Sequence, residues 1–465
     1  MLIFFIILYL AVTILIGWYA SRFVKNSQDF VLAGRKMPTF VVASGLFATW
    51  FGSETVMGAS SEFLEHGVLG IIEDPFGAAL CLLLIGLFFA RPLYKLNIYT
   101  FSDYFGQRFD KRVELVSAMF LIPSYFSWIA AQLVALAIIL QAIAGISFFW
   151  GIIICALVVL FYTYVGGMWS ISITDTLQTF MIIVGMSVLA VDLYINAGGW
   201  STIEQKVPDD FFRFVPKQNT GREWLAYFAA WITIGLGSIP QQDVFQRVLS
   251  AKSERVAVRG SIISSFMYLS VAMLPLIIVL CGSILYPSVK AHNNQMSIPN
   301  LVLMHTGIWM QILFFGALLS AILSTCSAAI LAPATVAAEN IIRPLYGDKI
   351  KDETLLKIMR YSTVAVTLVA VALSFNKSDI YELVGEASSL SLVALFVPLF
   401  SGIYWKRSNS IGAVLSMVLG TSVWVACLWI ETAISPMLWG FFASISGMLF
   451  GTFIFKADVK KIPVG

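Results

Sequence analysis

Long apolar runs alternate with short polar segments along almost the whole chain of 465 residues. Each run holds about 20 or more mostly apolar residues, which is the length that an α-helix needs to cross a bilayer. From this pattern we predict an all-α polytopic membrane protein, because a soluble domain could not bury so much apolar surface. The predicted spans number about 13 and lie at residues 2–21, 38–63, 68–96, 113–144, 147–166, 168–196, 223–250, 256–286, 307–342, 355–376, 379–404, 409–433 and 435–455.

The basic residues are distributed unevenly over the two sides of the membrane that these spans define. An odd number of spans places the two termini on opposite sides. If the N-terminus is outside, most of the 29 Lys and Arg fall in cytoplasmic loops, as membrane insertion favours. We therefore predict an inner or plasma membrane protein with its N-terminus outside and its C-terminus in the cytoplasm. The basic residues left on the outer side are Lys206, Arg213, Lys217, Arg222, Lys290 and Lys377.

The composition limits the kinds of molecule that this protein is expected to contact. Hydrophobic residues make up 59% of the chain and charged residues 12%, so the lipid bilayer is the expected surroundings. The basic residues lie in short loops, which excludes a nucleic-acid partner, and no segment indicates an obligate protein partner. The cysteines lie in apolar segments without metal-ligand spacing and are expected to be small buried side chains; they are Cys81, Cys155, Cys281, Cys326 and Cys427.

The second predicted span contains a polar interruption. In the stretch ASGLFATWFGSETVMG (43–58), Gly45 and Gly52 accompany Ser53, Glu54 and Thr55. An acid at membrane depth is a functional candidate by default, because it must face a protein interior or a watery cavity. Glycines beside hydroxyls indicate a helix that breaks and frees carbonyl oxygens for a cation. A continuous helix that packs closely through its small residues is the other interpretation.

A second interruption appears in WITIGLGSIPQQDVFQR (231–247), where Pro240 follows Gly235 and Gly237. Proline removes a backbone donor and kinks or breaks a helix. Each interrupted span opens a group of five spans, and an odd group size makes the second group run upside down relative to the first. This is the inverted repeat of secondary transporters. The predicted parts of the single transporter domain are a first helix and inner loop (1–37), a first repeat (38–196), an inverted second repeat (223–404) and peripheral C-terminal helices (405–465).

The ninth span presents hydroxyl groups along one helical face, with Ser320, Ser324, Thr325 and Ser327 in SAILSTCS. Hard cations such as sodium bind neutral oxygen atoms, and this face supplies them. The same small residues also allow membrane helices to pack closely without any ion. At this point both interpretations stay open.

Carboxyl groups lie in several spans. Asp175 stands about two turns inside the sixth span, and Glu73, Asp74 and Glu386 are further buried candidates. Helix capping or solvation at a helix end would also explain them. No Lys or Arg is expected in the middle of a span, so nothing would neutralise a strongly anionic solute. Aromatic side chains that can hold an ammonium group are expected near the cavity, namely Trp50, Phe51, Tyr125, Trp128, Trp231 and Phe245.

The chain resembles the sodium:solute symporter family over nearly its whole length. The matching motifs are DFVLAGRKMP (29–38), ATWFGSETVMG (48–58), LFFARPLYK (87–95), YTYVGGMWSISITDTLQ (162–178), IPQQDVFQRVLSAKS (239–253), SAILSTCSAAIL (320–331) and WKRSNSIGAVL (405–415). The resemblance implies the five-plus-five inverted repeat of the LeuT type, with one extra N-terminal and two extra C-terminal helices. It also implies sodium as the coupling ion.

The resemblance implies a specific sodium site. Its ligands would be the carbonyl oxygens of Ala48, Phe51 and Ala321 and the hydroxyl groups of Ser324 and Thr325. Asp175 matches a family acid close to that sodium, and some members use this acid and further hydroxyls for a second sodium. Here Ser327 fits such a second site, whereas Ala328 stands where another hydroxyl would help.

Solute contacts in the family come from the first, second, third, sixth and tenth core helices. By motif position the implied residues are Thr55, Asp74, Trp128, Gln241, Gln242 and Glu386. Several stretches are similar to the choline-transporter branch, but IPQQD departs from the aromatic residue that choline carriers have at that turn. The expected function is sodium-coupled symport of a small neutral, zwitterionic or cationic solute by alternating access, without enzyme activity.

Other functions would require other sequence features. An ion channel would need a continuous polar pore with charged rings or exposed filter carbonyls, and it would pass current without a solute. A membrane protein that senses a substrate without transporting it would share the site. A membrane-embedded enzyme would need a catalytic set, and His66, His292 and His305 form no metal pattern and lie near the outer face.

Overall fold

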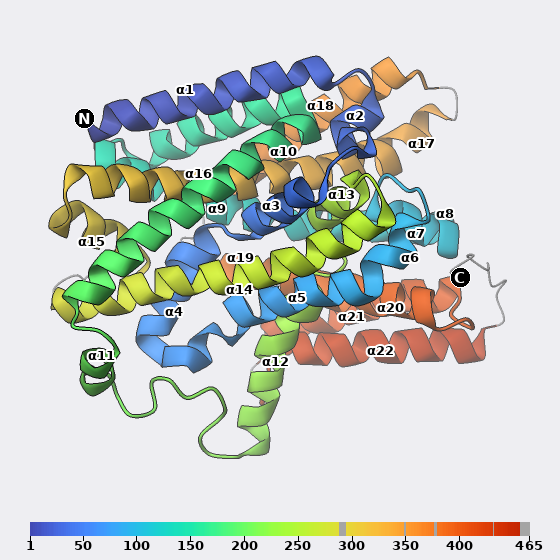
Figure 1. The fold of residues 1–465 in the computed structure, drawn as a ribbon. Coiled ribbons are helices and arrows are strands. Elements are labelled where there is room, and N and C mark those ends of the chain that lie inside the picture. Colours follow the sequence, from blue (N-terminus) through green and yellow to red (C-terminus); the bar gives the residue numbers. More distant parts are fainter. Residues whose placement is uncertain (288–293, 348–349, 376–378, 431, 456–465) are drawn as a thin grey trace.

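The long helices of the protein run roughly along one direction and pack side by side, as expected of spans that cross a bilayer (Figure 1). The structure is a computed structural model, and it describes residues 1–287, 294–347, 350–375, 379–430 and 432–455. Within these residues the chain forms helices and no strand beyond an isolated bridge between Met37 and Ala251. The prediction of an all-α membrane protein is confirmed.

The helices follow one another closely along the chain. In the first half they are α1 (Leu2–Ala20), α2 (Ser27–Leu32), α3 (Thr39–Trp50), α4 (Ala59–His66), α5 (Ala78–Leu84), α6 (Ala90–Tyr94), α7 (Phe101–Arg108), α8 (Lys111–Leu121), α9 (Phe126–Ala144) and α10 (Phe148–Asn196). In the second half they are α11 (Trp200–Lys206), α12 (Gly221–Gly237), α13 (Gln242–Ser250), α14 (Glu254–Leu285), α15 (Ser297–His305), α16 (Ile308–Val336), α17 (Arg343–Tyr346), α18 (Asp352–Leu373), α19 (Ile380–Ser391), α20 (Val397–Tyr404), α21 (Ser410–Leu428) and α22 (Pro436–Ile454).

Ten helices of the described chain are long and apolar enough to cross a membrane, compared with the predicted 13 spans. The difference comes from helices that join or break. The segment Phe148–Asn196 covers two predicted spans, and the chain reverses direction inside it at Gly167 (φ 49°, ψ −141°; Figure 1). The segment Glu54–Tyr94 joins half of the second predicted span to the third, and α12 and α13 are each too short to be counted.

The first predicted interruption is present. Helix α3 ends at Trp50, and Phe51 has non-helical angles (φ −82°, ψ 76°). The chain becomes helical again in the π-helical turn η3 (Glu54–Gly58), which continues into α4. At the gap the N–H of Ser53 donates to the side-chain oxygen of Gln132 instead of to its own helix (3.0 Å). Because lipid offers no hydrogen bonds, a break at this depth requires such partners from neighbouring helices.

The second predicted interruption is also present, between α12 and α13. Gly237 ends α12, residues 238–241 form a turn around Pro240, and α13 begins at Gln242. The close approach of α19 explains the glycine at the end of α12. A Cβ atom on Gly237 would lie 2.5 Å from the carbonyl oxygen of Ser388. The two gaps therefore lie at crowded positions inside the bundle.

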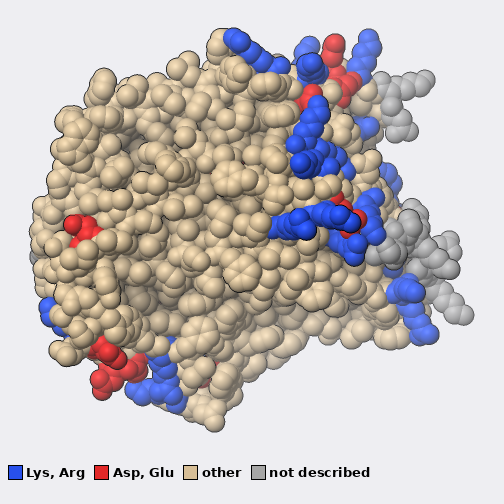
Figure 2. Space-filling view, viewed as in Figure 1, with Lys and Arg blue, Asp and Glu red and all other residues tan. Residues whose placement is uncertain are grey.

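Charged residues gather at the two ends of the bundle, and Lys and Arg are concentrated at one of them (Figure 2). Helix α22 ends at this basic end, whereas α1 begins at the opposite end (Figure 1). The middle of the visible face is almost free of charge, which suits contact with lipid. Of the basic residues predicted on the outer side, Lys290 and Lys377 lie outside the described residues, as does His292.

The long loop after α10 folds against the end of α4. The N–H of Val68 donates to the carbonyl oxygen of Phe211 (2.9 Å), and the rings of Phe63 and Phe211 contact each other edge to face. On the surface of this loop Lys217 donates to Asp210 (2.9 Å) and holds the pKa of that carboxyl below its ordinary value. The loop thus covers the end of α4, the helix that follows the first gap.

Close packing of α10 on α16 suggests a stability test. A Cβ atom on Gly185 would lie 2.6 Å from the carbonyl oxygen of Leu313. We expect Gly185→Ala to lower the free energy of unfolding by about 1–3 kcal/mol, because backbone must move to admit the methyl group. The matched control is Gly316→Ala in α16, whose methyl group would meet only the flexible end of Met181 at 3.3 Å. Thermal unfolding in detergent measures both, and equal melting temperatures for the two variants would contradict the argument.

Candidate functional site

A cavity lies between the two helix breaks. The volume open to the centre of a water molecule is about 20 Å³, so the cavity is narrow in this conformation. Ser238, Ser388 and aliphatic side chains form part of its wall. The remaining wall is aromatic or strongly polar and consists of Trp50, Glu54, Asp74, Trp128, Gln241 and Tyr268. Among the predicted solute contacts, Asp74, Trp128 and Gln241 therefore line the same space.

Glu54 is buried at the start of η3, immediately after the first gap. Its carboxyl group accepts a hydrogen bond from the indole N–H of Trp128 (3.0 Å) and another from the side-chain amide of Gln132 (2.8 Å). Both donors are neutral and belong to α9. Glu54 is thus oriented toward the cavity by hydrogen bonds, without a cationic partner.

Asp74 is the second acid of the cavity, and it lies in the π-helical segment η5 (Ile72–Gly77). Its Oδ1 lies 2.7 Å from the hydroxyl of Tyr268 in α14, and its Oδ2 lies 2.9 Å from the hydroxyl of Thr55 in η3. Those two hydroxyls are 2.6 Å apart, and the Tyr268 hydroxyl also lies 3.0 Å from the carbonyl oxygen of Trp50. Thr55 thus contacts the cavity wall through Asp74 and Tyr268.

A third buried acid connects the two broken helices. Asp243 in α13 accepts hydrogen bonds from the indole N–H of Trp50 in α3 (3.0 Å) and from the hydroxyl of Tyr125 (2.5 Å). Its own N–H donates to that same hydroxyl at 3.0 Å. Trp50 is thereby fixed in the cavity wall, with its polar edge turned toward α13.

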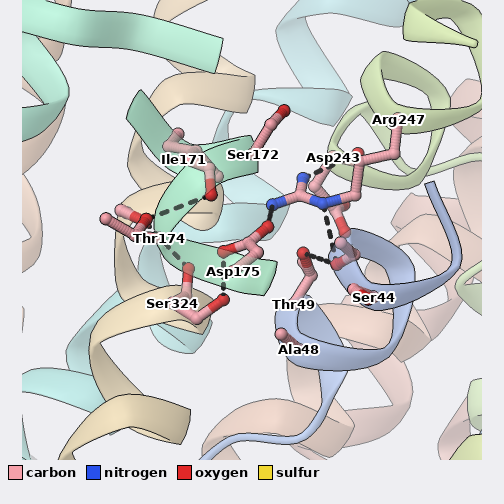
Figure 3. A network of polar contacts seen from close by, with 12 residues as sticks. Ser44, Ala48, Thr49, Ile171, Ser172, Thr174, Asp175, Asp243, Arg247 and Ser324 are labelled. Atoms are coloured by element: carbon pink, nitrogen blue, oxygen red, sulfur yellow. Dashed lines mark hydrogen bonds and ion pairs between the residues drawn. The ribbon is translucent and has the colours of Figure 1, made fainter. Parts of the chain in front are cut away.

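Beside the first gap, a charged pair is completely buried (Figure 3). Arg247 of α13 donates to the Oδ2 atom of Asp175 in α10 (3.0 Å) and to the carbonyl oxygen of Gly45 in α3 (2.9 Å). Ser324 of α16 donates to the other carboxylate oxygen, Oδ1 (2.5 Å). Side chains of α10, α13 and α16 and a backbone carbonyl of α3 therefore meet around this pair.

The position of Arg247 corrects the expectation that no basic side chain lies within the spans. Its side chain is 2% exposed, although its place in the sequence predicted a cytoplasmic loop. The physical reason is that α13 starts deep in the bundle, after the second gap, and needs less than three turns to reach its end at Ser250. The guanidinium does not line the cavity, because the atoms described above already hold it.

The residues expected to bind sodium lie close together next to this pair. The hydroxyl of Thr325 lies 3.4 Å from the carbonyl oxygen of Ala48 and 3.1 Å from that of Ala321. The chain just after Phe51 passes against the same hydroxyl, since a Cβ atom on Gly52 would lie 2.8 Å from it. The break in the first helix and one face of α16 thus bring neutral oxygen atoms together.

Three predicted residues have other surroundings. The Ser327 hydroxyl donates to the carbonyl oxygen of Ser324 in its own helix (2.9 Å). Gln242 does not line the cavity; its amide accepts from the N–H of Phe101 and donates to the carbonyl oxygen of Tyr99, at 2.5 and 3.2 Å. Glu386 is half-buried on α19 and is not part of the cavity wall.

Two of the aromatic residues expected near the cavity pack elsewhere. Trp231 contacts Phe76 and Phe214, and Phe245 contacts the ring of Phe101 with centroids 4.7 Å apart. No sequence motif pointed to Tyr268, which is one of several hydroxyl side chains in the mostly apolar helix α14. Its phenol ring also packs against the ring of Phe51. Only its partners, distant in the sequence, reveal its part in the site.

Comparison with known proteins gives a consistent result. A model of the sodium:solute symporter family matches residues 30–420. The high affinity choline transporter 1 of Homo sapiens is 27% identical over 439 residues, which cover 89% of this chain and 74% of that protein. The sodium/pantothenate symporter of Haemophilus influenzae is 24% identical and matches 98% of this chain and 95% of its own length. The sodium/glucose cotransporter of Vibrio parahaemolyticus is 25% identical, with 88% and 82% covered.

Solved structures show the same fold. A Na⁺-coupled sialic acid symporter in its substrate-bound, outward-open state superposes with a TM-score of 0.88 at 19% identity, over 99% of this chain and 98% of that one. MhsT in complex with L-phenylalanine superposes with a TM-score of 0.58 at 13% identity, over 90% and 97% of the two chains. The LeuT-type architecture predicted above is confirmed.

The buried pair suggests a test of its energetic role. We expect Arg247→Met to lower the free energy of unfolding by about 3–5 kcal/mol, because it leaves the Asp175 carboxylate buried without its cation. Adding Asp175→Asn to this variant is expected to restore part of the loss, since the unpaired charge is then gone. The control is Arg91→Gln, which breaks a mostly exposed pair with Glu254 and should cost at most about 1 kcal/mol. A double variant less stable than Arg247→Met would oppose this interpretation.

Proposed function

The chain belongs to the sodium:solute symporter family and is a multi-pass, sodium-coupled symporter of a small solute; we propose that this solute is an organic cation. Like its relatives it is a transporter and not an enzyme. The single observation that carries the proposal is the cavity wall. Glu54 and Asp74 both face the space between the two helix breaks, and no Lys, Arg or His is part of the wall that the structure describes.

The hydrogen bonds of these acids support the same conclusion. Glu54 is bonded to an indole and an amide, and Asp74 to two hydroxyls, so all four partners are neutral. A buried carboxylate without a cation is unfavourable, and a positively charged solute would supply the missing charge. An anionic solute would be repelled by the same wall.

Aromatic side chains give the cavity a second feature that suits an ammonium group. Trp50, Trp128 and Tyr268 line it, and the faces of such rings attract cations. Choline, the solute in the names of several relatives, is a quaternary ammonium ion. Other relatives are named for pantothenate and glucose, so the argument for a cation rests on the carboxyl groups of this chain.

For the coupling ion we propose the site predicted from the family motifs. The carbonyl oxygens of Ala48, Phe51 and Ala321 and the hydroxyls of Ser324 and Thr325 would hold one sodium ion. The short distances from Thr325 to Ala48 and Ala321 support this assignment, and neutral oxygen atoms suit a monovalent ion. Asp175 would lie near this ion through its bond to Ser324 and is also held by Arg247, and Ser327 is connected to the proposed site through its bond to the carbonyl oxygen of Ser324.

The proposed ion site explains how sodium and solute are coupled. A sodium ion at this position would join the interrupted first helix to α16, and the solute cavity begins directly after the same interruption. An ion can shift the balance between two conformations only if it binds one of them more tightly. We propose that sodium favours the outward-open form and that solute then favours closure. We also propose that the two inverted repeats comprise residues 38–196 and 223–404. The protein would lie in the cell membrane with its N-terminus outside.

The sodium site is tested by removing its hydroxyl ligands. We expect Thr325→Ala to weaken sodium binding about tenfold, equivalent to about 1.4 kcal/mol, because the ion loses one ligand. Ser324→Ala should act in the same direction. The measurement is binding of radioactive sodium to the purified protein. Ser320→Ala is the control, because that hydroxyl bonds to Tyr9 and to its own helix; unchanged affinity in both Thr325→Ala and Ser324→Ala would refute the site.

The solute class is tested by a thermal-shift screen with and without sodium. Quaternary ammonium compounds, primary amines, sugars and carboxylates are compared, because a true solute stabilises the folded protein. We expect stabilisation by a cationic compound, and we expect Glu54→Gln to abolish it. Glu204→Gln, an exposed acid in α11, should behave like the parent protein. Stabilisation by carboxylates alone would overturn the proposal, and liposome uptake of the stabilising compound distinguishes transport from sensing.

A further inference from the structure

Asp74, Thr55 and Tyr268 form a closed ring of three short oxygen contacts. The distances are 2.6 Å between the two hydroxyls, 2.7 Å from Tyr268 to Oδ1 of Asp74, and 2.9 Å from Thr55 to Oδ2. Each of the three residues is only 1% exposed. Distances of 2.6–2.9 Å are in the usual range of O–H···O hydrogen bonds, and oxygen atoms this close repel each other unless a hydrogen lies between them.

The number of hydrogen atoms in the ring can be counted. Thr55 and Tyr268 each bring one hydroxyl hydrogen, whereas an ionised carboxylate brings none. Two hydrogens cannot serve three contacts, and the carbonyl oxygen of Trp50, 3.0 Å from the Tyr268 hydroxyl, is one more acceptor in the same place. A third hydrogen on Asp74 completes the ring, because Oδ2 then donates to Thr55, Thr55 donates to Tyr268, and Tyr268 donates to Oδ1.

We propose that Asp74 is a proton-binding site and that it carries its proton in this conformation. The carboxyl group of Asp74 is then neutral, and the ring closes without an uncompensated charge. The inference rests on the proposed function in one respect only. With Asp74 neutral, Glu54 is the anion of the cavity that remains for the charge of the solute.

The charged and titratable groups around Asp74 agree with a bound proton. Glu54 of η3 shares the cavity with it, and Glu73 precedes it in η5, where its Oε1 atom is buried without a hydrogen-bond partner. Tyr268 faces it from α14 and Tyr381 from α19. No cationic side chain is among these groups in the part of the chain that the structure describes. Three ionised carboxyl groups here would repel one another, and a proton on Asp74 reduces that repulsion.

The ring also lies at the first helix break. Thr55 follows the gap, and the carbonyl oxygen of Trp50, which precedes the gap, lies 3.0 Å from the Tyr268 hydroxyl. Thr55, Asp74 and Tyr268 come from η3, η5 and α14, so a movement of η3 relative to η5 and α14 opens the ring. The proton therefore stabilises the conformation described here, and loss of the proton favours opening of the ring. Transport is expected to depend on pH through Asp74.

The test is infrared spectroscopy of the purified protein at neutral pH, which needs no knowledge of the solute. A protonated carboxyl group has a carbonyl stretching band that an ionised one lacks. We expect Asp74→Asn to remove the intensity of one such carboxyl group, while its amide keeps the ring by donating to Thr55 and accepting from Tyr268. Unchanged intensity would overturn the proposal, whether or not the solute is a cation.

Two further variants test whether the infrared band belongs to Asp74. Glu73→Gln is the matched control, because it removes the neighbouring buried acid from the same segment and should leave the Asp74 band in place. If Glu73→Gln instead removes that intensity, the proton belongs to Glu73 and the proposal is wrong. Tyr268→Phe is expected to shift the Asp74 band, since the carboxyl group loses a partner, and it serves if Asp74→Asn does not fold. A band that stays at the same frequency would also count against the ring.

Discussion

The structure depends on one constraint, which is that a helix broken inside a membrane must find new hydrogen-bond partners for its backbone. Lipid offers none, and each polar group without a partner is strongly unfavourable. At the first gap the partners come from three other helices. Gln132 of α9 accepts from the N–H of Ser53, the Tyr268 hydroxyl of α14 lies 3.0 Å from the carbonyl oxygen of Trp50, and Thr325 of α16 lies against that of Ala48.

These partners explain why the proposed binding sites lie at the gap. A side chain that reaches a freed backbone group brings its own polar atoms to the same place. Gln132 bonds to both Ser53 and Glu54, so the residue that satisfies the break also orients an acid of the cavity. Thr325 similarly belongs both to the gap and to the proposed sodium site. Stability of the broken helix and the proposed recognition of cations therefore depend on the same residues.

Much of this could be predicted from the sequence. Glycine, serine and proline inside apolar runs indicated both gaps, and adjacent hydroxyls in an otherwise apolar span indicated the face of α16. Side-chain direction was harder to predict. Gln241 lines the cavity while its neighbour Gln242, the first residue of α13, bonds to Tyr99 and Phe101. A switch from turn to helix between two identical residues sets these directions, and composition does not reveal it.

Depth in the membrane was the other quantity that the sequence did not show. Arg247 stands near a run of charged residues and was expected in a loop, yet it is buried because α13 starts at a gap within the bundle. Tyr268 looked like one more residue of an apolar helix, and its contacts with Thr55 and Asp74 depend on packing between segments 194 or more residues apart. Contacts over such separations follow from the fold as a whole.

Two contacts described above join α3 and α13, the parts of the two broken helices that lie on the same side of the gaps. Trp50 donates to Asp243, and Arg247 donates to the carbonyl oxygen of Gly45. The two half-helices are therefore bonded directly to each other, whereas η3 with α4 and α12 lie beyond the gaps. A change of angle at either gap would move the two bonded half-helices together, and the proposed solute cavity lies between the gaps.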